Sequence, residues 1–224
     1  MRITETFSSL QGEGGLAGVP SFFIRTTGCN LRCSWCDTPA ASWKPEGARR
    51  RVEELVGQAI DSGRRHVVIT GGEPLLQREL AELTSELVLR GRHLTVETAG
   101  TVTAEFTCHL LSVSPKTANS DPEGRWRERH RAGREKVAPL LWLLERHPDF
   151  QLKFVVRDKT DVPEILALME QLGIGGERVF LMPEGRTPAE VTARAPAVAG
   201  LCLQYGFRYS PRLQVDLFGG GPGV

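Results

Sequence analysis

The sequence has no excess of charge of either sign and no long apolar segment. It contains 28 Lys and Arg residues against 27 Asp and Glu residues. This balance disfavours both a disordered acidic chain and a strongly basic protein that coats nucleic acid. No window approaches the roughly 18 consecutive apolar residues that a membrane helix needs, and the first residues lack the basic and apolar regions of a secretory leader. We expect a cytoplasmic protein with no membrane partner, folded as one domain over residues 1–224.

The chain also lacks a second cysteine pair that would complete a structural metal site. Cys29, Cys33 and Cys36 are crowded together, whereas Cys108 and Cys202 stand alone. A disulfide framework is typical of an even, spread set in a small secreted chain, and structural zinc usually takes four protein ligands in two separated pairs. Three thiolates from one loop can instead hold an iron–sulfur cluster with one iron left open. That open iron indicates chemistry, while the two isolated cysteines are typical of small core residues.

Short apolar runs alternate with amphipathic patterns along the chain. The runs are rich in Val, Ile, Leu and Phe, as is typical of strands covered on both faces, and they predict strands over 21–25, 66–70, 93–98, 109–114, 151–156 and 178–182. The apolar spacing between them predicts helices over 52–60, 80–88 and 162–172. Asp161 and Glu164 should open the last helix, and the connection 100–108 is too short for one. We predict an α/β fold, a partial (β/α)6 barrel with one degenerate βα unit.

The chemically distinctive segments follow the carboxyl ends of the predicted strands, where parallel α/β folds build their active sites. They are the cysteine loop, Gly71-Gly72-Glu73-Pro74, Glu97-Thr98-Ala99-Gly100, Ser114-Pro115-Lys116 and Met182-Pro183-Glu184-Gly185. A glycine pair after a strand is most often a turn. Beside an open iron, however, it would let a ligand lie against the backbone, and Glu73 would offer a carboxylate to an amino group. A ligand with both an amine and a carboxylate could chelate that iron.

Two further groups allow a structural and a functional interpretation. Arg25 interrupts an apolar strand close to the cysteine loop. It could form an internal salt bridge with Glu13 or Glu5, or it could bind a substrate carboxylate. Asp37 and Thr38 could cap a turn, or they could provide the oxygen ligands that Mg²⁺ prefers. The spacing of these residues leaves both questions open.

Two stretches are biased in composition. Residues 123–136 carry six basic and three acidic side chains. Around Trp126 these arginines could contact RNA, but such a run is more often a solvated helix face or loop. The glycine-rich end over 219–224, taken alone, is typical of a frayed terminus.

The cysteine spacing and the glycine motif resemble those of the radical S-adenosylmethionine (SAM) superfamily. Residues 29–36 have its CxxxCxxC spacing, and 71–74 are similar to its GGEP motif. Within the superfamily, the chain is similar to the family of 7-carboxy-7-deazaguanine synthases at 9–14, 28–30, 35–38, 70–77, 114–116 and 223–224. The resemblance extends over essentially the whole chain.

This resemblance implies a carbon–nitrogen lyase, a homodimer, that acts on 6-carboxy-5,6,7,8-tetrahydropterin. A [4Fe–4S] cluster, reduced by an external flavodoxin-like protein, would cleave SAM to a 5′-deoxyadenosyl radical that removes a hydrogen from the pterin. Ring contraction and loss of ammonia would give 7-carboxy-7-deazaguanine for queuosine and other 7-deazapurines, with no direct nucleic-acid contact. Mg²⁺ would link Thr38, with Asp37, to the substrate.

The resemblance also assigns residues. The cluster would be held by Cys29, Cys33 and Cys36. SAM would be bound by Trp35, Gly71, Gly72, Glu73, Ser114, Pro115, Lys116, Met182, Pro183, Glu184 and Gly185. The pterin would be bound by Leu10, Gln11, Gly12, Glu13, Arg25, Thr70 and the carboxylate of Val224, which would make the glycine tail an ordered lid. The chain departs from the family pattern at Ala99 and Gln214, where Asn and His are commoner.

Two other functions share part of these features. A radical activase that places a glycyl radical on a partner protein would have the cysteine loop, but it would not need Gln11-Gly12-Glu13, Arg25 or Thr38. A zinc-stabilised RNA-binding module would use the cysteines and residues 123–136, but a fourth zinc ligand is missing. Metal analysis separates the two classes, because a cluster contains about four irons and a zinc module one zinc.

Overall fold

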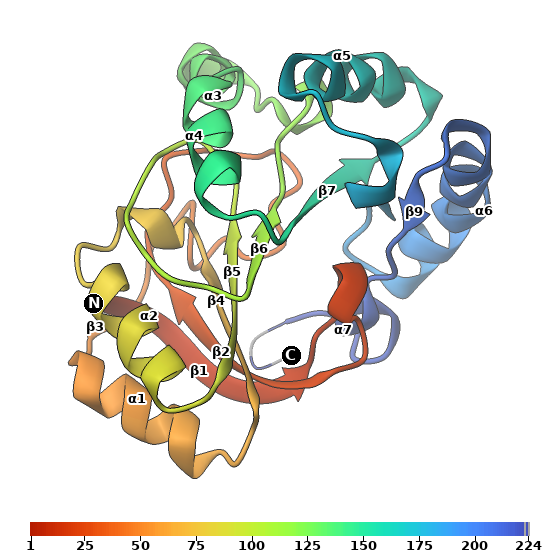
Figure 1. Ribbon diagram of the computed structural model, residues 1–224. Helices are drawn as coiled ribbons and strands as arrows, with labels where there is room; N and C mark the ends of the chain where they lie inside the picture. Colours follow the sequence, from red (N-terminus) through yellow and green to blue (C-terminus); the bar gives the residue numbers. More distant parts are fainter. Residues whose placement is uncertain (222, 224) are drawn as a thin grey trace.

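The six predicted strands form the centre of one sheet. The structure is a computed structural model that describes residues 1–221 and 223. The central strands lie side by side in chain order and are parallel throughout, namely β2 (Pro20–Thr26), β4 (His66–Gly71), β5 (His93–Thr98), β6 (Leu110–Val113), β7 (Phe150–Val156) and β8 (Val179–Pro183). The sheet curves but does not close (Figure 1). The predicted partial barrel is confirmed.

Three strands at the sheet edges were not predicted. β1 (Arg2–Leu10) runs antiparallel to β2 and carries β3 (Ala48–Arg49) on its outer side, and β9 (Arg208–Tyr209) follows β8 at the other edge. β1 has no apolar run, because most of its residues are polar and partly exposed. Its strand conformation is favoured mainly by pairing with β2, which a search for apolar runs does not detect.

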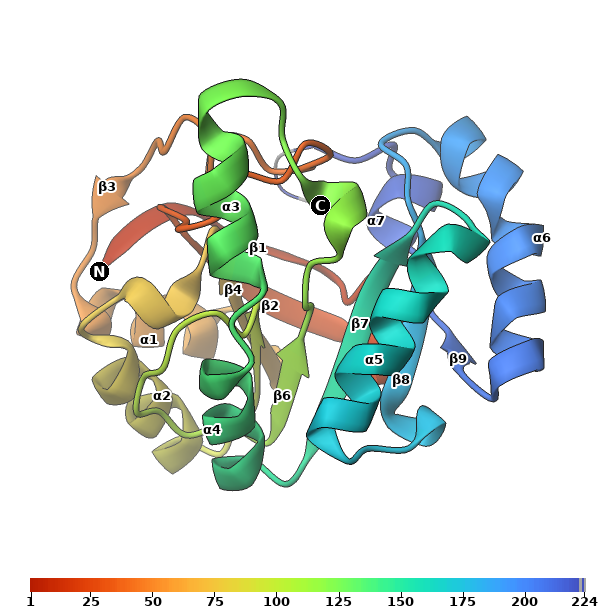
Figure 2. The same ribbon diagram turned by 90° about the horizontal axis from the view of Figure 1, so that it is seen from above.

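The predicted helices form at nearly the predicted bounds and cover the outer face of the sheet (Figure 2). They are α1 (Val52–Asp61), α2 (Leu80–Leu89) and α5 (Val162–Leu172). Their apolar faces supply core residues such as Leu55, Leu83 and Ile165, all fully buried. The other helices are α3 (Arg127–Arg134), α4 (Ala138–Arg146), α6 (Pro188–Tyr205) and α7 (Leu213–Asp216). None of the described helices is both long enough and apolar enough to cross a membrane.

Six short 3-10 helices complete the described elements. They are η1 (Gly14–Leu16), η2 (Pro74–Leu76), η3 (Ala118–Ser120), η4 (Gly124–Trp126), η5 (Lys159–Asp161) and η6 (Gly176–Arg178).

No helix lies between β5 and β6 in the described chain, which confirms the degenerate βα unit. Asp161 and Glu164 open α5 as expected, with Asp161 at the N-cap and Glu164 in the first turn, but the Asp161 side chain does not cap the helix. Because η5 leads directly into α5, Asp161 is already helical, and its carboxylate accepts from the Arg157 amide instead.

The two isolated cysteines belong to the packing of the fold, as predicted. Cys202 lies on the inner face of α6 and is part of the hydrophobic core. Cys108 is partly buried against the same core, and its sulfur lies 3.6 Å from Nδ1 of His147. Burial raises the pKa of the Cys108 thiol to about 12, so it is an unreactive neutral thiol at physiological pH.

Candidate active site

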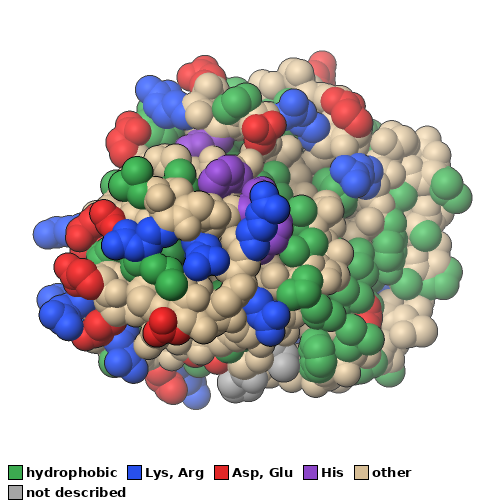
Figure 3. Space-filling model, turned by 60° about the horizontal axis from the view of Figure 1, so that its bottom comes forward, with side chains coloured by type: hydrophobic (Ala, Val, Ile, Leu, Met, Phe, Trp, Pro, Cys, Tyr) green, Lys and Arg blue, Asp and Glu red, His purple; other side chains and the backbone are tan. Residues whose placement is uncertain are grey.

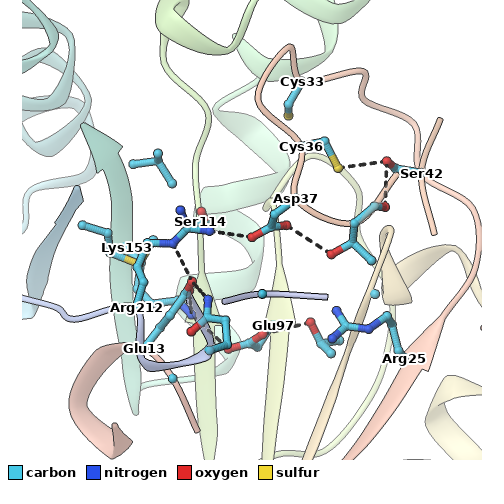
Figure 4. Close-up of a pocket in the computed structure, with 18 of the residues that line it drawn as sticks. Glu13, Arg25, Cys33, Cys36, Asp37, Ser42, Glu97, Ser114, Lys153 and Arg212 are labelled. Atoms are coloured by element: carbon cyan, nitrogen blue, oxygen red, sulfur yellow. Dashed lines mark hydrogen bonds and ion pairs between the residues drawn. The ribbon is translucent and has the colours of Figure 1, made fainter. Parts of the chain in front are cut away.

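The carboxyl ends of the parallel strands surround a cavity of about 490 Å³. Most residues assigned from the sequence line it, from elements far apart in the chain. They are Leu10, Gln11, Gly12, Glu13, Arg25, Cys29, Cys33, Trp35, Cys36, Asp37, Thr38, Thr70, Gly71, Gly72, Ser114, Lys116 and Met182. In Figure 4 Cys33 and Cys36 lie at one end of the cavity, and Glu13, Glu97 and Arg25 lie at the other.

Several assigned residues do not line the cavity. They are Glu73, Pro115, Pro183, Glu184 and Gly185, while Val224 lies outside the described residues. Glu73 differs most from expectation, because its carboxylate is fully buried behind the cavity wall. It accepts hydrogen bonds from the Thr98 hydroxyl (2.7 Å) and the Ala99 amide (2.9 Å), and burial raises its pKa. The carboxylate thus ties η2 to the end of β5 rather than facing a ligand.

The glycine pair is required by packing between protein segments. A Cβ atom on Gly71 would lie 2.2 Å from the carbonyl oxygen of Thr26, and one on Gly72 would lie 2.2 Å from that of Gly28. Gly71 also has φ +136°, a conformation that favours glycine. The two glycines therefore let the end of β4 lie directly against the start of the cysteine loop, while their backbone still borders the cavity.

The cysteine loop is held by hydrogen bonds on both sides of its thiols. The Leu31 amide donates to Cys29 Sγ (3.4 Å), Trp43 Nε1 donates to the Cys33 carbonyl (2.9 Å), and Cys36 Sγ lies 3.0 Å from the Ser42 hydroxyl. Burial raises the thiol pKa to about 11 at Cys29 and about 12 at Cys33. These thiols would be bound as thiolates only when a metal takes the place of their protons.

The three thiols suit a cluster rather than a single metal ion. Within residues 1–221 and 223, no three Cys, His, Asp or Glu side chains converge closely enough to bind one metal ion. A [4Fe–4S] cluster requires no such convergence, because each thiolate binds a different iron. The three thiols border one cavity, and in addition to burial the nearby Cys29 and Cys36 thiols raise the pKa of Cys33. They are therefore suited to three corners of a cluster.

A buried lysine that the sequence analysis missed lies at the opposite end of the cavity. Lys153 on β7 has a side chain only 2% exposed, and its Nζ lies 3.0 Å from Glu13 Oε2 and 2.9 Å from Glu97 Oε1 (Figure 4). The Thr70 hydroxyl and the Gln11 amide also donate to Glu97, at 2.9 and 3.3 Å. Burial alone would raise the pKa of Glu13, but Lys153 and then Arg212 lower it to about 2. Glu13 is therefore an ionised acceptor at neutral pH.

Arg212 connects this charged group to the cysteine loop. Its Nη2 lies 2.6 Å from Asp37 Oδ2, its Nε lies 3.5 Å from Glu13 Oε1, and its Nη1 donates to the Gly185 carbonyl. Gln214 donates to the same oxygen, Glu13 Oε1, at 2.7 Å, so this departure from the family pattern supports Glu13. The Thr38 hydroxyl donates to Asp37 Oδ1 at 3.1 Å. A cation at Asp37 would therefore share that carboxylate with an arginine.

Arg25 forms an internal salt bridge and also borders the cavity. Its Nε donates to Glu5 (2.7 Å) rather than to Glu13, and its guanidinium lies over the ring of Phe7 at 5.3 Å. The same side chain borders the cavity. A ligand carboxylate in the cavity would therefore meet a guanidinium that Glu5 already orients.

The glycine tail does not fray over the residues that the structure describes. Gly219, Gly220 and Gly221 line the cavity, and the Gly223 amide donates to Glu5 Oε2 at 3.0 Å. The interpretation of the tail as a loose end is wrong here, because its backbone finds a polar partner beside Arg25. Over residues 219–221 the tail borders one side of the cavity, and the ordered lid that would end at Val224 stays a prediction.

Ser114 and Lys116 form the wall between the two ends of the cavity. Lys116 Nζ donates to the carbonyl (2.8 Å) and the hydroxyl (2.6 Å) of Ser114, and it lies 5.5 Å from the centre of the Trp35 ring. With Arg186, which the sequence analysis also missed, five basic and three acidic side chains line the cavity. The cavity is therefore suited to an anionic ligand.

Comparisons with known proteins find a matching superfamily, related sequences and a related structure. Residues 23–151 match the model of the Radical SAM superfamily. The chain is 46% identical over 235 residues to a 7-carboxy-7-deazaguanine synthase from Halobacterium salinarum, covering 98% of this chain and 91% of that protein. A second 7-carboxy-7-deazaguanine synthase, from Rhodopirellula baltica, is 43% identical over 226 residues, covering 99% and 88%. The crystal structure of QueE from Escherichia coli superposes with a TM-score of 0.69 at 28% identity, covering 93% of this chain and 92% of that chain.

Proposed function

Because this chain belongs to the Radical SAM superfamily and, within it, to the family of 7-carboxy-7-deazaguanine synthases, we propose that it converts 6-carboxy-5,6,7,8-tetrahydropterin to 7-carboxy-7-deazaguanine. The resemblance seen in the motifs is confirmed, and the chain is an enzyme of a superfamily that uses a [4Fe–4S] cluster and SAM. One observation carries the substrate proposal: a single cavity joins the three thiols to an end lined by the carboxylates of Glu13 and Glu97 and the cations of Arg25 and Lys153.

Cys29, Cys33 and Cys36 would hold the cluster, which supplies the electron that cleaves SAM when both are bound. The backbone of Gly71 and Gly72 lies beside that loop and would meet the amino-acid part of SAM. Trp35, Ser114, Lys116 and Met182 line the adjoining wall and would contact the nucleoside. The buried Glu73 would support this arrangement indirectly, by fixing the strand ends that carry it.

The other end of the cavity would bind the pterin. Glu13 and Glu97 are carboxylates held by Lys153, so they accept hydrogen bonds and are complementary to the N–H groups of a pterin ring. Arg25, oriented by Glu5, would bind the substrate carboxylate. The main-chain tail over 219–221 would cover the ring and limit access of water to the radical.

Arg25→Ala should weaken pterin binding while SAM cleavage continues without product formation. Loss of a charge-assisted hydrogen bond costs about 1.5–3 kcal/mol, which corresponds to a roughly 10- to 100-fold higher Kd for the pterin. Glu5→Gln is the matched control, since it removes the charge that orients Arg25 and keeps the guanidinium. Isothermal titration with the pterin measures both. An unchanged Kd in Arg25→Ala would make Arg25 purely structural.

We also propose that Mg²⁺ binds between the substrate and the Thr38 hydroxyl, with Asp37 nearby. Hydroxyl and carboxylate oxygens suit Mg²⁺ when water and substrate complete its shell, and both side chains line the cavity. Thr38→Val should raise the Mg²⁺ concentration that gives half-maximal product formation by about tenfold, whereas Thr38→Ser, which keeps the hydroxyl, should not. Equal Mg²⁺ dependence in all three proteins would remove Thr38 from the site.

We propose a homodimer that pairs through the apolar side of α6, β9 and the segment after α7. Large hydrophobic side chains are exposed there, at Leu203, Tyr205, Tyr209, Leu217 and Phe218. Figure 3 shows hydrophobic side chains gathered on that side of the molecule. Leu203→Glu should give a monomer by light scattering, whereas Leu89→Glu on the remote helix α2 should not, although the two leucines are 88% and 78% exposed. If the Leu203→Glu variant is still a dimer, the interface lies elsewhere.

The proposed reaction is tested by anaerobic assay of the brown, iron-loaded protein with the carboxytetrahydropterin, SAM and dithionite. Mass spectrometry should detect 7-carboxy-7-deazaguanine, formed with loss of ammonia. SAM cleavage without that product would favour the activase alternative, and a colourless protein with one zinc would favour the RNA-binding module. We place this single-domain enzyme in the cytoplasm, where reducing conditions keep its thiols available for iron.

A further inference from the structure

We propose that the exposed face of η4 and α3, next to the cysteine loop, is the docking site of an acidic one-electron carrier protein. The inference rests on the proposed function, in which an electron must reach the cluster from outside the chain. It concerns residues 123–136, the basic stretch that the site described above does not use.

Helix α3 is attached directly to the cysteine loop. His130 is 1% exposed, and its Nδ1 accepts a hydrogen bond from the Arg32 amide at 2.9 Å, while its Nε2 lies 2.9 Å from the Ser120 hydroxyl. One turn further, Gly133 lies so close to Leu31 that a Cβ atom would be 3.0 Å from that side chain. The helix therefore packs directly against the loop, and a protein bound to α3 would be adjacent to the cluster.

The outer surface of the helix and the loop carries a dense group of cations. Arg32, Arg125 and Arg129 gather around the ring of Trp126, at 5.1, 5.2 and 5.9 Å from its centre. Within the described chain none of these three guanidiniums forms a salt bridge. This contrasts with Arg134 on the same helix, which is buried and paired with Asp121 and Glu164, both at 2.6 Å. Three unpaired cations so close together repel one another, and a partner's carboxylates would relieve that repulsion.

Arg32 links this surface to the cluster loop itself. Its Nη1 donates to the carbonyls of Cys29 (2.7 Å) and Leu31 (2.6 Å). Its guanidinium also lies between two indoles, 5.1 Å from the ring of Trp126 and 6.0 Å from that of Trp43. An acidic protein bound over Trp126 would therefore contact a side chain that is bonded to the backbone of a cluster ligand.

The surface favours an acidic protein over RNA. Single-stranded RNA is usually bound by stacking its bases on free aromatic faces, but arginines already surround Trp126. The rest of the chain offers no extended cationic track, because the net charge is only +1. In the proposed step one electron leaves the reduced carrier and enters the cluster; the carrier is oxidised, the cluster is reduced, and no bond or proton changes.

The test compares charge reversal at this face with the same change elsewhere. The variant is Arg125→Glu with Arg129→Glu, and the matched control is Arg64→Glu with Arg65→Glu. Arg64 and Arg65 are also exposed but precede β4, at the opposite end of the strand from the cavity. The readout is the rate at which a reduced acidic flavodoxin bleaches the visible absorption of the loaded protein in stopped flow, at low and high salt. Thermal melting establishes that both double variants are folded. If the charge-reversed variant at this face does not fold, Arg125→Gln with Arg129→Gln takes its place.

At low salt the face variant should be reduced by flavodoxin at least about tenfold more slowly than the parent and the control. The parent rate should fall with salt, and the variant rate should depend on salt less. Reduction by dithionite, and SAM cleavage driven by it, should be equal in all three proteins. Equal rates of reduction by flavodoxin in the parent, the face variant and the control would overturn the docking site. A face variant that is reduced at the parent rate but loses affinity for a tRNA transcript would overturn it as well. Failure of the dithionite-driven reaction in the parent protein would instead refute the proposed function.

Discussion

Cys33→Ala should give a folded protein that holds no [4Fe–4S] cluster and forms no detectable 5′-deoxyadenosine from SAM. The cysteine loop offers three thiols for the four irons of the cluster. Without Cys33, two thiolates remain, and two of the four irons then have no protein ligand. Cys33 is also the most buried of the three. Because burial raises its pKa to about 12, its thiol is neutral in the free protein, and its removal leaves no unpaired charge behind.

Iron and sulfide analysis after anaerobic reconstitution measures the first part, and chromatography of the SAM reaction measures the second. Cys108→Ala is the matched control. It removes a partly buried thiol that packs against the core outside the cavity, so it should retain about four irons per chain and cleave SAM normally. Circular dichroism should show the same fold for both variants without iron. Full iron content and SAM cleavage in Cys33→Ala would refute the assignment of the cluster ligands.

The fold was predictable where the sequence pattern is local. The buried parallel strands are nearly continuous apolar runs, so β2 and β4 to β8 were located within one or two residues. β1 was missed because RITETFSSL has neither an apolar run nor strict alternation, and its conformation depends on pairing with β2. α3 was expected only as a solvated helix face or loop. Its inward contacts come from His130 and Gly133, which carry no helical apolar pattern.

The site was predictable where chemistry depends on spacing, as in the CxxxCxxC loop. Lys153 was missed although it gave the same signal as Arg25, a single charged side chain inside an apolar strand. Arg212 gave no such signal, because its partners Asp37 and Glu13 lie far away in sequence and only the folded chain brings them together. Glu73 shows the converse. Its motif placed it correctly after β4, but only the structure shows its carboxylate bonded to the Thr98 hydroxyl and the Ala99 amide.

Lys153→Met should destabilise the folded chain by about 3–5 kcal/mol, because it removes the cation from a buried ion pair and leaves the carboxylates behind. Lys153 is the shared partner of Glu13 and Glu97 and is almost completely buried. Methionine keeps most of the side-chain volume, so the loss should come from electrostatics rather than from a cavity. Lys159→Met, at an exposed position after the same strand, is the control and should change the free energy of unfolding by no more than about 0.5 kcal/mol. Urea unfolding of the iron-free proteins measures both.

The pH dependence distinguishes this cause from loss of packing. In the parent protein the pKa of Glu13 is about 2, below its usual value of 4.5, so its stabilising contribution is present above pH 4.5 and is lost as pH falls towards 2. In Lys153→Met burial is no longer offset by the lysine, and only Arg212 and the hydrogen bond from Gln214 still favour the ionised form, so the pKa of Glu13 should rise. The deficit in the free energy of unfolding relative to the parent should then shrink as the pH is lowered, because protonation of Glu13 removes a buried charge that has lost its lysine partner. A second substitution, Glu13→Gln, should restore part of the lost stability at neutral pH for the same reason. A deficit that is independent of pH and unaffected by Glu13→Gln would mean that Lys153 acts through packing, and that Glu13 and Glu97 do not depend on it for their charge.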